Sequence, residues 1–159
     1  MSLDLRRAFG HYATGVTVIT TTTPAGQRKG MTANSFASLS LEPPLVLWSI
    51  AKTSSNFEAF RGARNFAVHV LHAGQAALAR QFATREIDRF EGITCEVGRS
   101  GAPLLCDYHA CFDCETQEVI EGGDHLILIG RVLECHERAG APLIFYRGRF
   151  LETVMGGTA

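Results

Sequence analysis

The sequence lacks a hydrophobic run long enough to span a bilayer, and its first residues lack the apolar stretch of a signal peptide. It also lacks an excess of charge of either sign, because 15 Lys and Arg residues stand against 16 Asp and Glu residues, for a formal net charge of -1. Such a chain presents no general electrostatic field to a nucleic acid or an anionic membrane. We therefore expect a soluble, cytoplasmic protein with neither kind of partner.

Familiar site motifs are missing too. The chain contains no GxGxxG and no P-loop, so a flavin or a dinucleotide would need a site of another design. The five cysteines include Cys111 and Cys114, but no second CxxC pair completes a zinc site. Residues three apart on a strand point to opposite faces, so these two thiols would not reach one ion. We expect buried free thiols and no metal.

The composition is that of an ordinary globular protein, with 46% apolar and 19% charged residues in a chain of 159. This length favours a single domain over residues 1–159. Apolar spacing over residues 5–12 predicts an amphipathic helix. The β-branched stretch 16–23, a turn at 24–26 and an extended stretch 30–38 together predict a hairpin.

Short strands and helices continue the pattern. Residues 45–50 are nearly all apolar and predict a strand that is buried on both faces. A short helix follows, with capping-box spacing between Ser55 and Glu58. Residues 66–71 predict a strand, and the Ala-rich stretch 75–83 predicts a helix.

The second half of the chain is mostly β. Residues 110–120 alternate, with Phe112 on one face and Asp113 on the other. Gly122-Gly123 signals a turn, and residues 126–133 and 145–151 predict further strands. We expect an α+β, mainly β fold with an antiparallel barrel. A strand that is apolar on both faces needs a second apolar surface, which either a dimer interface or a covering helix could supply.

The stretch 30–36 is the most unusual in the chain. An extended strand displays its backbone amides and carbonyls at regular intervals, and small side chains at Ala33 and Ser35 would let a flat ring approach them. Thr32, Asn34 and Ser35 offer donors and acceptors to a ring edge such as the flavin pyrimidine. On chemistry alone a polar edge strand or turn explains these residues better, since such residues are common in loops.

Three further segments could carry chemistry. Residues 52–55 place a lysine and three hydroxyls before a predicted helix, which suits either an anion or an ordinary N-cap. His125, in Gly123-Asp124-His125, could contact a nicotinamide or serve as a structural residue in a hairpin. Arginines in the stretch 146–150 could bind phosphate or simply end a charged strand.

Several of these motifs, in this order, resemble the short-chain flavin reductase family of the FMN-binding split barrel. The resemblance extends over nearly the whole chain, and the matching runs are residues 9–18 (FGHYATGVTV), 30–36 (GMTANSF), 38–45 (SLSLEPPL), 123–125 (GDH) and 145–148 (FYRG). The resemblance implies a homodimeric, antiparallel Greek-key split barrel with short peripheral helices. It also implies that NADH or NADPH reduces FMN or FAD near the subunit interface. The reduced flavin then diffuses to a partner flavin-dependent monooxygenase.

The resemblance also implies which residues form the site. His125 positions the nicotinamide without a covalent role, Phe82 approaches the flavin ring, and Tyr146 and Arg147 lie near the same pocket. The flavin ring lies on Met31, Thr32, Ala33, Asn34, Ser35 and Phe36, and its ribityl and phosphate groups on Ser49, Ile50, Ala51, Lys52, Ser54, Ser55 and Asn56.

Two alternative functions stay open at this point. One is a flavoprotein that retains FMN for electron transfer or oxidase chemistry. The other is a barrel that binds flavin without catalysis. The sequence also leaves open the choices between FMN and FAD and between NADH and NADPH.

Overall fold

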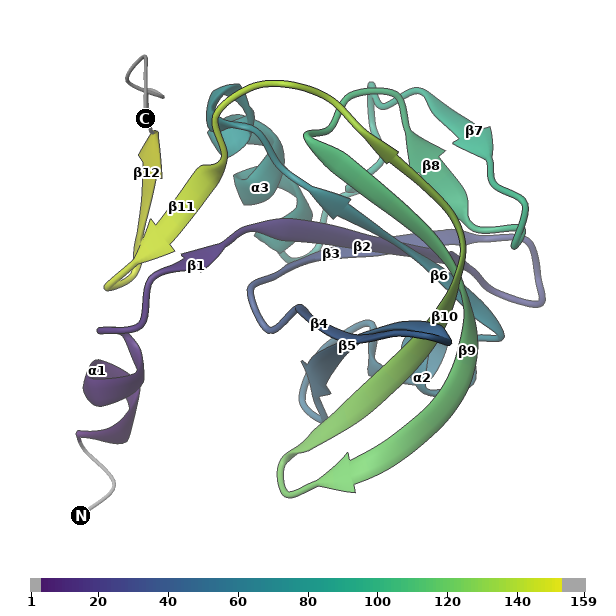
Figure 1. Cartoon of the computed structure of the whole chain (residues 1–159), viewed down its shortest axis with the longest axis horizontal. Helices are drawn as coiled ribbons and strands as arrows, with labels where there is room; N and C mark the ends of the chain where they lie inside the picture. Colours follow the sequence, from purple (N-terminus) through teal and green to yellow (C-terminus); the bar gives the residue numbers. More distant parts are fainter. Residues whose placement is uncertain (1–3, 153–159) are drawn as a thin grey trace.

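A seven-stranded antiparallel sheet dominates residues 4–152, the part of the chain that the computed structural model describes (Figure 1). The sheet curves until β3, at one edge, contacts β5 near the other edge. In spatial order its strands are β3 (Arg28–Ala33), β2 (Thr17–Thr22), β6 (Asn65–Val70), β9 (Ala110–Gly122), β10 (His125–Glu137), β5 (Pro44–Ala51) and β4 (Ala37–Leu41). The prediction of a mainly β, antiparallel fold is confirmed.

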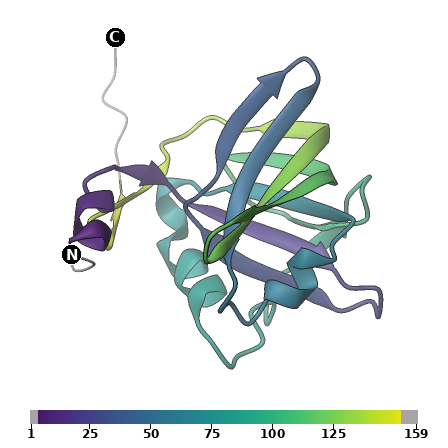
Figure 2. The ribbon, with the colours of Figure 1, turned by 90° about the horizontal axis from the view of Figure 1, so that it is seen from below.

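Smaller elements surround this sheet. A three-stranded sheet and the first helix stand to one side of it (Figure 2). The helices of the described part are short, and none could cross a bilayer. These elements are α1 (Leu5–Phe9), β1 (Thr14–Gly15), α2 (Phe57–Arg61), the 3-10 helix η1 (Ala73–Gln75), α3 (Ala76–Ala83), β7 (Cys95–Val97), β8 (Pro103–Leu105), β11 (Leu143–Tyr146) and β12 (Arg149–Glu152).

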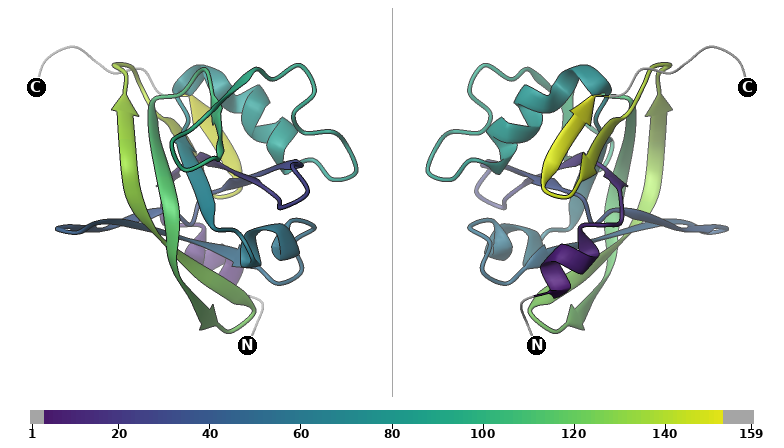
Figure 3. Two further views of the ribbon diagram at one scale, coloured as in Figure 1. Left: turned by 90° about the vertical axis from the view of Figure 1, so that its right-hand side faces the viewer. Right: turned by 90° about the vertical axis from the view of Figure 1, so that its left-hand side faces the viewer.

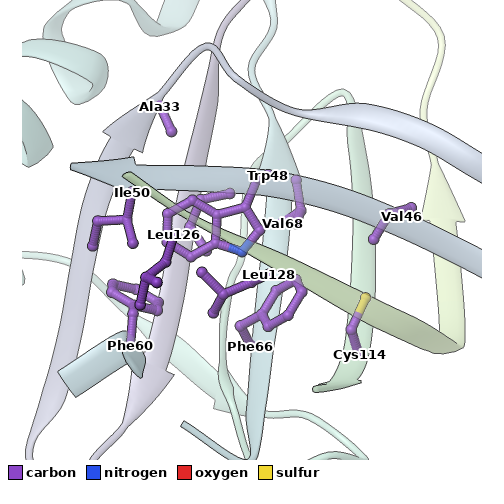
Figure 4. Packing of buried hydrophobic residues seen from close by; sticks show 11 residues of the cluster. Ala33, Val46, Trp48, Ile50, Phe60, Phe66, Val68, Cys114, Leu126 and Leu128 are labelled. Atoms are coloured by element: carbon purple, nitrogen blue, oxygen red, sulfur yellow. The ribbon is translucent and has the colours of Figure 1, made fainter. Parts of the chain in front are cut away.

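The core lies inside the curve of the sheet. Trp48 is fully buried there, with the ring of Phe60 4.8 Å away and that of Phe66 6.0 Å away, both edge-on (Figure 4). A second apolar cluster lies under α3 and includes Phe82 and Leu143. Aromatic rings in this arrangement bury a large area with few rotamers, which fixes the curvature that brings distant strands together.

Several sequence predictions need correction in their details. The hairpin of β2 and β3 is confirmed, but the extended stretch 30–38 breaks after Ala33 and resumes at Ala37. The helix predicted over residues 5–12 ends at Phe9, where the Gly10 amide donates to the Arg6 carbonyl at 3.0 Å. The stretch 145–151 was predicted as one strand, but it contains a turn and belongs to the hairpin of β11 and β12. The first strand of this hairpin also pairs with β1, in a sheet separate from the large one.

Burial also differs from the predictions. On β5 only alternate residues are buried, namely Val46, Trp48 and Ile50, whereas Leu47 faces outward and is half-buried. The helix α3 packs on β2 and β3, so it does not cover the outer face of β5. Asp113 was expected on a polar face, yet it is buried, because it accepts hydrogen bonds from the amide and hydroxyl of Ser100.

Two local predictions have clear outcomes. The capping box of Ser55 is wrong, because α2 begins one residue later, after Asn56, and no side chain caps it. Cys111 and Cys114 are confirmed as buried free thiols on β9.

One buried histidine ties three strands together. The Nδ1 atom of His69 lies 3.0 Å from the Val18 carbonyl, and its Nε2 atom accepts a hydrogen bond from the Leu105 amide at 3.0 Å. A neutral imidazole has one N–H donor and one acceptor nitrogen. Since Nε2 accepts from Leu105, Nδ1 carries the proton and donates to the Val18 carbonyl. Burial lowers the pKa of His69 to about 4, although the bond to Val18 opposes this shift.

We predict that His69 makes folding stability depend on pH. Its pKa falls from 6.5 in the unfolded chain to about 4 in the folded protein, so the unfolded state binds more protons between these values. The contribution of neutral His69 to the free energy of unfolding is fully present above pH 6.5 and is lost as the pH falls towards 4. The total loss is about 3 kcal/mol. Urea unfolding of the wild type and of His69→Gln across this range measures it. Parallel curves for the two proteins would contradict the assignment.

Candidate functional site

The candidate site follows the free edge of β3. This strand pairs with β2 on one side only, since it is the last strand of the sheet. The Gly30 carbonyl points away from β2, because it accepts hydrogen bonds from Asn56 Nδ2 at 3.0 Å and from an Arg89 guanidinium nitrogen at 2.9 Å. In an antiparallel strand alternate residues point the same way, so the amide and carbonyl of Thr32 also face outward.

Glycine at position 30 is required by packing. A Cβ atom there would lie 2.7 Å from Cε1 of Phe82, whose ring is fully buried in the cluster under α3. The absence of a side chain therefore lets α3 pack closely on β3. Thr32 reinforces this contact, because its hydroxyl donates to the Ala79 carbonyl at 2.6 Å. The edge of β3 is thus held by α3 and by the side chain of Asn56, the residue before α2.

Three neighbouring cavities follow this edge, and we call them together the edge groove. They have volumes of about 210, 230 and 220 Å³, and neighbouring cavities share lining residues. The inner cavity is lined by Val16, Thr32, Ala33, Asn34, Ala83, Phe145 and Phe150. The middle cavity is lined by Met31, Thr32, Ala51, Thr53, Ser54, Ser55, Phe82, Ala83, Arg85 and Arg89. The outer cavity is lined by Arg28, Lys29, Gly30, Ser55, Asn56, Glu86, Ile87, Asp88, Arg89 and Phe90.

The groove changes character along its length. Apolar side chains and the open backbone of Thr32 line the inner end, whereas hydroxyls and guanidinium groups line the middle. Such a gradient suits a ligand with a flat apolar ring at one end and an anionic group at the other. The groove gathers most of the predicted ring and phosphate residues on one surface: Met31, Thr32, Ala33, Asn34, Ala51, Ser54, Ser55, Asn56 and Phe82.

Sequence reasoning missed two cations of the middle cavity, Arg85 and Arg89. Both belong to the loop after α3, in the run Arg85-Glu86-Ile87-Asp88-Arg89, where balanced charges look like an ordinary solvated loop. Burial lowers the pKa of the Arg89 guanidinium, and the nearby charge of Arg85 lowers it further. Two like charges held this close together favour an anion between them.

Other predicted residues serve the frame of the groove. The Ser35 hydroxyl donates to the Ser49 carbonyl at 2.9 Å and accepts from the Ser49 amide at 3.0 Å, which ties the loop after β3 to β5. The Phe36 ring stacks on Phe112 with 5.6 Å between centroids. Ile50 is buried in the core, so its side chain does not reach the groove.

Lys52 lies beside the groove with its ammonium turned to another partner. Its Nζ atom is 2.6 Å from Oε2 of Glu121, in an ion pair that solvent reaches from both sides. Of the residues predicted to hold the phosphate, Ser54 and Ser55 line the middle cavity, whereas Lys52 does not. Arg85 and Arg89 supply the positive charge there instead.

His125 begins β10, at the tip of the long hairpin with β9 (Figure 1). It pairs with Ala51 of β5, and the Lys52 amide donates to the Asp124 carbonyl at 2.9 Å, so the turn is fixed beside the middle cavity. Asp124 Oδ1 accepts from His125 Nδ1 at 2.7 Å, and this bond lowers the pKa of the Asp124 carboxyl. Among the described residues, no hydrogen bond engages the Nε2 atom of His125.

Arg147 and Tyr146 lie at the opposite end of the edge groove. Arg147 occupies the turn between β11 and β12 with φ of 50°, and its amide donates to the Gly10 carbonyl at 3.1 Å. Arg147 lines a larger cavity of about 710 Å³ together with Asn34, which also lines the inner cavity. Within one chain, Arg147 therefore adjoins the groove through Asn34, whereas His125 adjoins it through Ala51.

Known proteins are similar to this chain in sequence and in fold. The FMN reductase (NADH) SmoA of Agrobacterium fabrum is 47% identical over 149 residues, which are 94% of this chain and 84% of that protein. The NADH:FAD oxidoreductase of Streptomyces globisporus C-1027, solved in complex with NAD and FAD fragments, matches with a TM-score of 0.90 at 39% identity, over 98% of this chain and 94% of that chain.

Longer relatives also match. The probable flavin reductase of Rhizobium meliloti is 43% identical over 155 residues, which are 98% of this chain but 50% of that protein, so the chain spans about half of its length. The family model described as the flavin reductase like domain matches residues 9–153. That match runs from the last residue of α1 through β12 and includes the segments that line the edge groove, and the chain belongs to the flavin reductase like family.

Proposed function

We propose that this protein is an NAD(P)H-dependent flavin reductase that supplies reduced FMN or FAD to a partner monooxygenase. The open backbone edge at Thr32 carries this proposal, because it is aligned with an apolar wall at Ala33 and Ala83 and with two cations farther along the groove. A flavin needs these three features in this order, for its pyrimidine edge, its ring and its phosphate. The residues present therefore fit the cofactor.

Each part of the groove has a role in holding the flavin. The Thr32 amide and carbonyl bond the edge of the ring, and small residues at positions 33 and 83 let the ring approach the backbone. Ser54, Ser55 and Arg85 bind the phosphate. When bound, the flavin supplies the acceptor for the hydride of NADH or NADPH. The protein's task is to align the two rings and to exclude other poses, with no side chain acting as a nucleophile.

His125 positions the nicotinamide in this proposal. Asp124 is acceptor-only when ionised, so its bond places a proton on Nδ1 of His125. In that tautomer Nε2 is an acceptor, which suits the amide hydrogens of a carboxamide. The bond to Asp124 also holds the ring in one orientation, although both side chains are partly exposed.

We also propose that two copies form a split-barrel homodimer in the cytoplasm. The outer face of β5 and β10 carries half-buried Leu45, Leu47, Ile127 and Ile129, and Ile129 lies directly opposite Leu47. Apolar side chains at the end of α1 and in the turn after it are exposed as well, at 71% for Phe9 and 80% for Tyr12. A second copy would cover such surfaces. The five free cysteines suit a reducing compartment.

Anaerobic mixing with NADH and each free flavin tests the proposed function. We expect the visible flavin absorbance to bleach with multiple turnovers, and gel filtration afterwards to separate the flavin from the protein. Flavin that stays on the protein through filtration would instead favour an electron carrier or oxidase. Absence of bleaching with FMN, FAD and riboflavin would favour a binding protein without catalysis.

Arg85→Ala is predicted to weaken flavin binding. Loss of one charge-assisted hydrogen bond to a phosphate raises the KM for FMN by about ten-fold. The KM for riboflavin, which has no phosphate, stays within about two-fold. Arg61→Ala is the matched control, because Arg61 is an exposed arginine on α2 that pairs with Glu58 away from the groove. An equal effect of Arg85→Ala on riboflavin and FMN would contradict the phosphate role.

His125→Ala is predicted to affect the hydride donor more than the flavin. Without Nε2 to orient the carboxamide, the KM for NADH rises by about five-fold or more, while the KM for flavin changes by less than about two-fold. Steady-state kinetics with each substrate varied in turn measure both values. Unchanged constants for NADH would remove the proposed role of His125.

Ile129→Glu is predicted to convert the dimer to a monomer. A carboxylate placed opposite Leu47 would have to be buried in an apolar interface without a partner. Light scattering after gel filtration reports the mass, and circular dichroism confirms the fold. Val97→Glu, at a position that is 83% exposed on β7, is the control and should leave the mass unchanged. A wild-type monomer would refute the dimer directly.

A further inference from the structure

We infer that the outer cavity of the edge groove binds the adenosine phosphate half of FAD, so that this protein prefers FAD to FMN. The inference rests on the proposed function, because it needs the flavin ring and first phosphate in the inner and middle cavities. It assigns a role to residues that those cavities do not use: Arg28, Lys29, Glu86 and Asp88.

The outer cavity continues the groove past the proposed phosphate position. It shares Ser55 and Arg89 with the middle cavity, so a chain that leaves the phosphate there enters it directly. Its volume of about 220 Å³ is similar to that of the middle cavity, at about 230 Å³. An FMN molecule ends at its only phosphate and would leave this space to water.

The lining of the outer cavity matches the groups that FAD adds to FMN. Arg28 and Lys29 bring positive charge for a second phosphate. Glu86 and Asp88 bring carboxylates, which accept hydrogen bonds from the two hydroxyls of a ribose. Asp88 Oδ1 already accepts from the Phe90 amide at 3.0 Å, so the other oxygen remains for this bond.

Arg28 also offers a flat surface for the adenine. Its guanidinium carbon lies 4.9 Å from the centroid of the Phe90 ring, so the guanidinium covers one face of this aromatic residue. Phe90 is fixed in turn, because its ring meets Phe82 edge-on at 5.1 Å. A guanidinium held in one plane can stack on a purine while its edge bonds a phosphate. An FMN site needs none of these groups.

Equilibrium binding of the two flavins to the whole protein, without NADH, tests the inference. We expect the Kd for FAD to be about ten-fold below that for FMN, since one or two further charge-assisted hydrogen bonds form. Lys29→Ala and Arg28→Gln should each raise the Kd for FAD by about three-fold to ten-fold. Both should leave the Kd for FMN within about two-fold, because FMN does not enter the outer cavity.

Arg61→Ala is the matched control, and thermal unfolding shows whether each variant folds. Lys29→Ala keeps the test decisive if Arg28→Gln unfolds, since only Arg28 covers Phe90. Equal Kd values for FMN and FAD in the wild type would overturn the inference and leave the proposed function standing. So would an equal loss of both flavins in the variants. Absence of binding by either flavin would overturn the proposed function and the inference with it.

Discussion

The unpaired backbone edge of β3 is the constraint on which the account of this protein depends. A buried strand edge needs partners for its amides and carbonyls, and most sheets avoid the problem by adding another strand. Here Asn56 and Arg89 satisfy the Gly30 carbonyl, while the backbone of Thr32 stays open to the groove. The protein thus satisfies part of the edge itself, and the proposed flavin would satisfy the rest with its own polar edge.

Sheet curvature turns this edge into a site. Aromatic packing around Trp48 bends the sheet until the loop after β5 lies beside β3, and Figure 3 shows the resulting layer of strands with α3 on one side. Hydroxyls from residues 53–55, the arginines after α3 and the edge of β3 then line one groove, although they come from distant parts of the chain. On the outer face of β5 and β10, apolar residues such as Leu47 and Ile129 are half-buried, and this face is the proposed dimer surface.

The sequence predicted segments better than it predicted side-chain roles. The GMTANSF motif begins on β3, and the GDH and FYRG motifs lie at the two turns beside the groove. Such segments can be predicted from a short sequence pattern, because the pattern depends on neighbouring residues. The roles of Ser35 and Lys52 were less visible, since Ser49 and Glu121, the residues they bond, are 14 and 69 positions away. Arg85 and Arg89 escaped notice because neighbouring carboxylates balance their charge, and only the fold shows that they line the same cavity as the hydroxyls of residues 53–55.

The most direct test of the central claim is hydrogen exchange at single amides, measured by NMR with and without flavin under oxidising conditions. The account predicts that the Thr32 amide exchanges quickly in the free protein and becomes protected when FMN or FAD binds, because the ring edge supplies its missing partner. The Met31 amide, which pairs with β2 in both states, should change little. Flavin binding that leaves Thr32 unprotected and instead protects amides away from β3 would contradict the account.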